Sequence, residues 1–84
     1  MDEAEKQQEL EKADIRCIMR LEGGRRFIHK LLTQSGVAHD VFDVNPHQHA
    51  YNAGQRANGV MLNNMVAEAA PEYYLQMNKE HLDG

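Results

Sequence analysis

The sequence predicts an all-α fold, a small bundle of three main helices plus a short C-terminal helix. Long stretches consist of strong helix formers whose apolar residues recur at helical spacing. Helix-breaking residues separate these stretches, namely Gly23-Gly24, Gly36, Asn45-Pro46 and Pro71. We therefore expect helices at residues 2–20, 24–35 and 48–69 and a fourth from residue 71, joined by short connections.

The first helix, residues 2–20, combines a charged start with an apolar end. Residues 1–12 are mostly charged, and we expect a partly ordered acidic extension there, followed by one helical domain over 13–84. The buried positions expected in this helix are Leu10, Ala13, Ile15, Cys17, Ile18 and Met19. The glycine pair at 23–24 should end or kink it.

The second helix, residues 24–35, has one apolar side. At about 100° per residue, Phe27, Ile28, Leu31 and Leu32 share an arc of about 140°, and Gly24 lies within it. We expect Gly24 to be a helix-packing residue that allows another backbone to approach closely. Gly36 fits the left-handed residue that caps a helix C-terminus.

Residues 38–47 predict an extended connection in which Phe42 covers the edge of the core.

In the third helix, residues 48–69, the predicted buried arc consists of Ala50, Tyr51, Ala57, Met61, Leu62, Met65 and Ala69. Gly54 falls within that arc and is the second predicted helix-packing glycine. Pro71 suits the first turn of the fourth helix, and Glu72 suits its positive N-terminal end.

The size of the chain favours assembly. It has 84 residues, no Trp, two Phe and five Met. A chain this short hides a small fraction of its surface, and methionine specifies a unique packing poorly. We therefore expect a homo-oligomer or a complex with a larger partner.

The sequence contains few features that indicate a cellular compartment. The single cysteine, Cys17, excludes an internal disulfide and a zinc knuckle. The acidic start has no apolar segment typical of a signal peptide, and no stretch approaches the roughly 18 apolar residues of a membrane span. We expect a soluble protein made in a reducing cytoplasm.

No motif predicts catalysis, a metal or a cofactor. His47 and His49 diverge by about 200° on a helix, and no third ligand has usable spacing. The glycines fit neither dinucleotide nor phosphate-loop patterns. Cys17 is interpreted as a buried thiol without a base nearby. We expect no enzyme, no cofactor and no metal site.

Charge leaves a second function open. Residues 1–14 carry six acids and two bases, whereas residues 15–35 carry five bases against one acid. The bases are Arg16, Arg20, Arg25, Arg26 and Lys30. They allow a nucleic-acid-binding or regulatory module using residues 16–30, although the net charge of −4 predicts weak or no nucleic-acid binding. The other interpretation is a solvated helix face that pairs with the acidic start of the chain.

A narrow polar stripe opposite the apolar arc of the third helix is the strongest candidate site. It consists of Asn52, Arg56, Gly59 and Asn63, at i, i+4, i+7 and i+11. One arginine among amides and a glycine favours a flat hydrogen-bonding contact, whereas a solvent face usually carries Glu and Lys pairs. We predict a protein interface at these residues, with Arg25 and Arg26; the alternative is a plain solvent face.

The chain resembles the Bbp19-like proteins of tailed bacteriophages in several short sequence motifs that occur in a fixed order. They are D-I-R at 14–16, G-R-R-F at 24–27, L-L at 31–32, G-V at 36–37, Y-N-x-G-x-R at 51–56, Gly59 and A-P-E-x-Y at 70–74. The chain departs from the family at Cys17 or Ile18, where a Trp is common, and in residues 38–47, where the family is Ser/Thr-rich.

This resemblance implies a small virion protein made in the host bacterial cytoplasm. It would be a head-internal, portal-associated or ejection-associated component, packed against itself and larger virion proteins. The family implies no catalytic residue.

Overall fold

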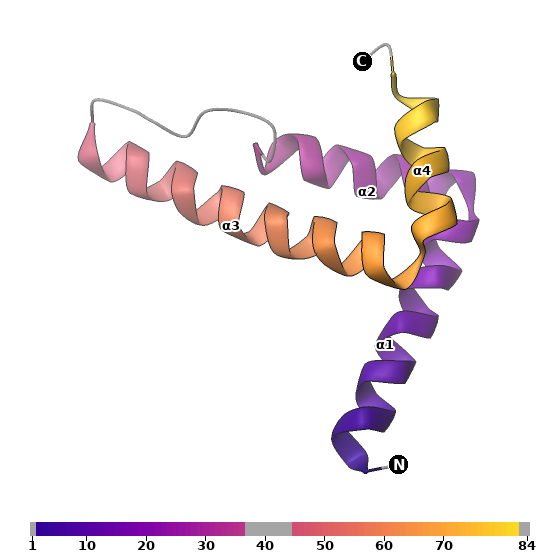
Figure 1. Cartoon of the computed structure of the whole chain (residues 1–84). Helices are drawn as coiled ribbons and strands as arrows, with labels where there is room; N and C mark the ends of the chain where they lie inside the picture. The colour runs from indigo at the N-terminus through magenta and orange to yellow at the C-terminus, as the bar shows by residue number, and fades with distance from the viewer. Residues whose placement is uncertain (1, 37–44, 83–84) are drawn as a thin grey trace.

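The computed structural model describes residues 2–36 and 45–82, and it confirms the all-α fold. Four helices follow one another: α1 (Glu3–Arg20), α2 (Glu22–Gln34), α3 (Pro46–Ala69) and α4 (Pro71–Glu80). They meet at one junction, from which the N-terminal half of α1 and the whole of α4 leave in opposite directions (Figure 1). Helices α2 and α3 extend from the junction side by side. No strand occurs in the described residues.

Helix α1 begins with a conventional cap and projects beyond the other helices. The Asp2 carboxylate accepts a hydrogen bond from the Glu5 backbone N–H at 2.8 Å, and Glu3 and Glu5 complement the positive helix end. Every described residue before Ile15 is exposed, and the first turns of α1 stand clear of the other helices (Figure 1). The helix is continuous through residue 12, where the sequence predicted the end of an extension.

The corner between α1 and α2 is a single residue. Leu21 is extended, with φ −89° and ψ 135°, and α2 begins at Glu22. Gly23 and Gly24 therefore lie in the first turn of α2, whereas the sequence predicted that they would separate the helices. The turn is tight enough that a Cβ on Gly24 would overlap the Ile18 carbonyl oxygen and lie 2.8 Å from its carbonyl carbon.

The end of α2 agrees with the sequence. The backbone N–H of Ser35 donates to the Leu31 carbonyl at 3.0 Å, and that of Gly36 donates to Thr33 at 3.2 Å. Gly36 has φ +73°, in the left-handed region that the capping residue requires. The connection predicted over 38–47, with Phe42 at the edge of the core, falls largely on residues 37–44, outside the described part.

Helix α3 begins at Pro46, two residues before the predicted start, and Asn45 caps it. The Asn45 side chain accepts from the backbone N–H groups of His47 and Gln48 at 2.9 and 3.2 Å, and Pro46 opens the helix. At the other end, Ala70 turns the chain sharply and Pro71 opens α4.

The core lies at the junction and is small. Each helix supplies buried side chains, and every pair of helices is in contact. The buried apolar residues are Met19, Ile28, Leu32, Val66, Ala69, Ala70 and Met77. The molecule measures 47 × 36 × 15 Å, which allows two packed helix layers and no third. Most helices therefore keep one face outside.

This thinness corrects several burial predictions. Leu10, Ala13, Cys17 and Ile18 of α1 are exposed, and only Met19 of the expected set is fully buried. In α2, Ile28 and Leu32 are buried, whereas Phe27 is 53% exposed and Leu31 also reaches solvent. The helical spacing was sound, but part of each apolar arc has no neighbouring helix to cover it.

Candidate protein-interaction surface

Two arginine–glutamate pairs attach the ends of α4 to the other helices. At its first turn, Arg16 of α1 donates to the Glu72 carboxylate at 2.6 Å and to the Ala69 carbonyl at 3.1 Å. Arg16 thus pairs with α4 while satisfying a carbonyl at the C-terminus of α3. Glu72 has its pKa lowered by a hydrogen bond from its own backbone N–H and then by Arg16.

The second pair is more enclosed. Arg25 of α2 is only 5% exposed, and its Nε and Nη2 donate to both carboxylate oxygens of Glu80 at 2.8 and 2.9 Å. Its Nη1 donates to the carbonyls of Met19 and Arg20, both at 3.0 Å, so it also caps the end of α1. The hydrogen bond raises the pKa of Arg25 and lowers that of Glu80, so both groups stay charged.

These pairs change the interpretation of the basic segment. Two of its five bases, Arg16 and Arg25, pair with α4 and not with the acidic start of α1. Arg26 stays exposed, 3.9 Å from Glu22 on the same helix. The interface predicted at Arg25 is corrected, because this side chain is directed into its own chain and has little surface to offer a partner.

The stripe on α3 faces the other helices and not the solvent. Gly59 is buried, and Asn52 and Asn63 are half-buried. The Tyr74 hydroxyl of α4 donates to the Asn63 side-chain oxygen at 2.9 Å, and Gln48 donates to Asn52 at 2.8 Å. The prediction that these three residues form an open polar face is therefore corrected. They lie on the side of α3 that carries the buried Val66.

Arg56 differs from its neighbours on the stripe. It is exposed and lies at the edge of the inward face of α3. Its role at an interface stays a prediction.

The outward face of α3 is the unexpected feature. Tyr51 and Met61, which the sequence predicted to be buried, are each 59% exposed, and Gly54 and Asn58 are exposed between them. With the half-buried Met65, these residues follow alternating three- and four-residue spacing, the pattern of a helix-pairing face. We call Tyr51, Gly54, Asn58, Met61 and Met65 the α3 seam. It is apolar except for the Asn58 amide at its middle and the Tyr51 hydroxyl, which accepts a hydrogen bond from Gln55 at 2.9 Å.

The prediction that Gly54 is a helix-packing glycine is also corrected. A Cβ added there would meet no atom of the described residues within 4 Å. Gly54 therefore packs against no helix of its own chain in the part that the structure describes, whereas Gly24 has the close backbone neighbour that was expected.

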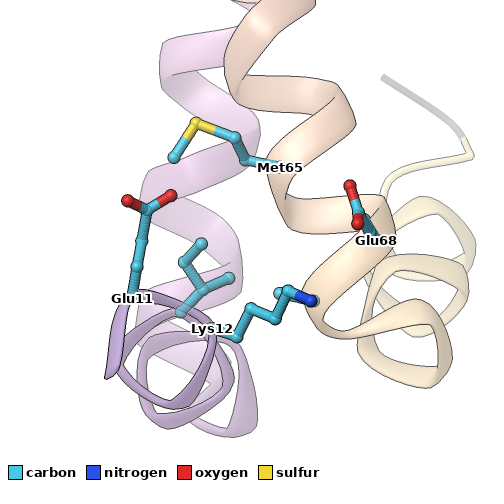
Figure 2. A pocket seen from close by; sticks show the side chains of 6 residues that line it. Glu11, Lys12, Met65 and Glu68 are labelled. Carbon is cyan, nitrogen blue, oxygen red and sulfur yellow. The ribbon is translucent and has the colours of Figure 1, made fainter. Parts of the chain in front are cut away.

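A groove lies where the seam reaches α1. It encloses about 240 Å³, solvent included, and its apolar lining is Ile15, Met65 and Ala69. Glu11 and Lys12 of α1 and Glu68 of α3 surround this apolar part (Figure 2). An apolar body with a polar tip would suit such a site.

Two histidines stack between α2 and the end of α4. The rings of His29 and His81 lie 3.9 Å apart at an interplanar angle of 10°. His81 Nδ1 donates to the Met77 carbonyl at 2.8 Å, which closes the last turn of α4. Burial, followed by the proximity of His81, lowers the pKa of His29. Protonating His29 would place a positive charge against the His81 ring.

Cys17 is exposed, which corrects its interpretation as a core thiol. It lies in a shallow groove between α1 and α4, lined also by Ala13, Arg16, Arg20 and Tyr73. The side chains of Arg16 and Arg20 therefore lie in the same groove as Cys17.

Within residues 2–36 and 45–82, no three His, Cys, Asp or Glu side chains gather as a metal site would require. None of the described helices is long and apolar enough to span a membrane. Fold and surface together define a small all-α protein whose most distinctive exposed feature is a mainly apolar helix face.

The family of this protein follows from its sequence. A model of the Bbp19-like phage proteins matches residues 15–79, and the chain belongs to that family of phage proteins. The match confirms the resemblance and covers the junction, the seam and nearly all of α4. Comparisons with curated proteins and with solved structures gave no match.

Proposed function

We propose that this phage protein is a structural component of the virion that acts by packing against other proteins and not by catalysis. Its place would be inside the head, at the portal or among the ejected components. The observation that carries the proposal is the α3 seam, an exposed and mainly apolar helix face on a member of a phage protein family. Exposed apolar surface of this kind is typical of a protein-binding site.

The charge distribution supports contact with protein. The 24-residue helix α3 carries only Arg56 and Glu68 as charged residues, whereas the chain as a whole is 26% charged. Core regions of protein interfaces are depleted in charge and enriched in tyrosine and methionine. Partners in this proposal are other copies of the chain and larger virion proteins.

Arg56 and Arg26 are the proposed contacts for a larger virion protein. Both are exposed, and Arg56 lies on the side of α3 away from the seam. An exposed arginine can form two parallel hydrogen bonds with a carboxylate of a partner.

Nucleic-acid binding is the alternative, and we expect it to be weak. Arg16 and Arg25 already pair with carboxylates, and the net charge of −4 opposes contact with phosphates. Duplex DNA should bind poorly even at low salt. Tight binding that weakens steeply as salt rises would favour the nucleic-acid module instead.

Mass spectrometry of purified particles tests the main proposal. Particles of the phage that encodes the chain would be analysed before and after genome release. We expect the wild-type chain in intact particles, and its presence or loss after release would separate a retained component from an ejected one. Arg56→Ala should fold normally but be incorporated less than Lys79→Ala, an exposed change on α4. Absence of the wild-type chain from intact particles would refute a virion role.

A further inference from the structure

We propose that a second copy of this chain pairs antiparallel along the α3 seam, with Tyr51 of each copy inserted in the groove between α1 and α3 of the other. This inference deepens the self-association included in the proposed function. It names the surface, the register and the anchoring residue.

The register follows from the sizes and chemistry of the seam residues. If the two-fold axis passes near Asn58, Tyr51 of one copy faces Met65 of the second copy, and Gly54 faces the second copy's Met61. The small Gly54 leaves room for the methionine and allows the backbones to approach. This arrangement gives a role to Gly54, which has no neighbour within its own described chain.

Asn58 supports the same position of the axis. In this register it faces its own equivalent, and two such amides can exchange hydrogen bonds because each has both a donor and an acceptor. Other antiparallel registers along the seam would bring this exposed amide against Gly54 or an apolar side chain. A single asparagine in an otherwise apolar helix-pairing seam fixes register in this way, at some cost in stability.

The groove lies where this register requires it. Met65, which would face the second copy's Tyr51, is also a lining residue of the groove. The tyrosine ring would rest on Ile15, Met65 and Ala69. Its hydroxyl would reach the charged groups around them, Glu11, Lys12 and Glu68 (Figure 2). Tyrosine is well suited to such a place because one end is apolar and the other forms hydrogen bonds.

Charge is complementary in the antiparallel arrangement and unfavourable in the parallel one. The first turn of α3 contains no acidic residue, and its helix end is positive. In the proposed register it approaches the second copy's Glu68 and the acidic start of the second chain, where residues 1–14 carry a net −4 from six acids and two bases. A parallel pair would instead bring the two Glu68 side chains together.

The surface area is consistent with one missing contact. The chain exposes 6179 Å², whereas a compact 9.6 kDa monomer exposes about 5,100 Å². A stable interface buries about 800 Å² on each partner. The seam from Tyr51 to Met65 spans about 21 Å of helix, and each tyrosine anchor would add about 150–250 Å².

Sedimentation velocity of the full chain provides the first test. We expect a dimer for the wild type and at least a tenfold rise in dissociation constant for Tyr51→Ala and for Met61→Glu. Leu75→Glu is the matched control, because Leu75 is 62% exposed and lies on α4, outside the seam, and it should leave the dimer intact. Circular dichroism should show the same helix content in all four proteins. A monomeric wild type would overturn the proposal, and it would point to another protein as what covers the seam.

Cysteine pairing tests the register. In a Cys17→Ser background, a mixture of Gly54→Cys and Met61→Cys proteins should form a disulfide-linked heterodimer under mild oxidation. Neither protein should cross-link with itself, and exposed Asn64→Cys, off the seam, should not cross-link with either. Self-cross-linking of Gly54→Cys would indicate a parallel pair and overturn the antiparallel register, as would a dimer that survives Met61→Glu. Neither result would bear on whether the chain is present in virions, which the particle analysis decides separately.

Discussion

Single residues at the junction have roles that the sequence could not reveal. Arg25 was predicted to lie at a protein interface. It is buried because Glu80, 55 residues later, supplies both carboxylate oxygens and because two carbonyls of α1 take the remaining hydrogen bonds. Spacing within one helix contains no information about such a partner.

The two glycines on helices should respond in opposite ways to the same substitution. Gly24→Ala should destabilise the fold by about 1–3 kcal/mol, because its Cβ would overlap the Ile18 carbonyl. Gly54→Ala should stabilise the monomer by about 0.5–1 kcal/mol, because its Cβ meets open space and alanine loses less backbone entropy. Urea denaturation at low protein concentration measures both changes. If Gly54→Ala is as destabilising as Gly24→Ala, α3 packs differently from the arrangement described.

His29, which stacks on His81, should make stability depend on pH. Burial lowers the pKa of His29 below its usual 6.5, so the unfolded chain binds more protons near that pH. Stability should therefore be complete above about pH 7 and fall as the pH decreases through about 6.5 and below. Glu72 and Glu80 have lowered pKa values, so they stabilise the fold while they are ionised. That stabilisation is lost only at more acidic pH, below 4.5, as the two carboxylates become protonated.

Unfolding free energies measured between about pH 5 and 7.5 check this prediction. His29→Gln should flatten the slope over that range, and His47→Gln, an exposed change at the start of α3, should not. A slope that persists unchanged in His29→Gln would show that the stacked pair is not its source.

At the scale of elements, the sequence predicted the helices well and their orientation poorly. The bounds of all four helices agree within two residues with the predicted ranges, because capping residues and prolines act locally. Helix α3 is rotated by about a third of a turn from the predicted orientation, at 100° per residue. Its inner face carries Gly59 and Asn63, which look polar in sequence, and Tyr74 of α4 satisfies Asn63. The outer face carries Tyr51 and Met61 because nothing in the described chain covers it.

Helix α4 should depend on the Arg25–Glu80 pair. Arg25→Lys retains the charge but loses the two parallel hydrogen bonds and the cap on α1, so α4 should open more often. Hydrogen exchange should accelerate in α4 more than in the part of α3 that contains Val66. Arg26→Lys is the control, since Arg26 is exposed and only loosely paired with Glu22. Equal protection of α4 in Arg25→Lys and wild type would show that the pair does not hold this helix.

The N-terminal half of α1 should add little to the stability of the monomer. Residues 2–9 are all exposed, and an isolated helix of this length is marginal in water. Deleting them should leave the thermal midpoint almost unchanged, whereas Met77→Ala, which empties a fully buried position, should cost about 2–5 kcal/mol. A drop of several degrees in the deletion would mean that this segment docks on its own chain.

For the whole molecule, the fold class and the family were predictable, but the shape was not. Capping residues and helical spacing predicted four helices. The short motifs in their fixed order predicted the Bbp19-like family, which the family match confirms. The 15 Å thickness depends on how helices cross, and no local pattern determines this. The same thinness leaves the α3 seam outside and connects the fold to the proposed role in assembly.

The most direct test of that role is the number of copies of each variant in purified particles. A phage lacking the gene would be complemented with wild-type, Met61→Glu or Leu75→Glu protein, and quantitative mass spectrometry would compare the particles. We expect equal incorporation of wild type and Leu75→Glu and at least a tenfold loss for Met61→Glu. Wild-type copy numbers of Met61→Glu would contradict that role.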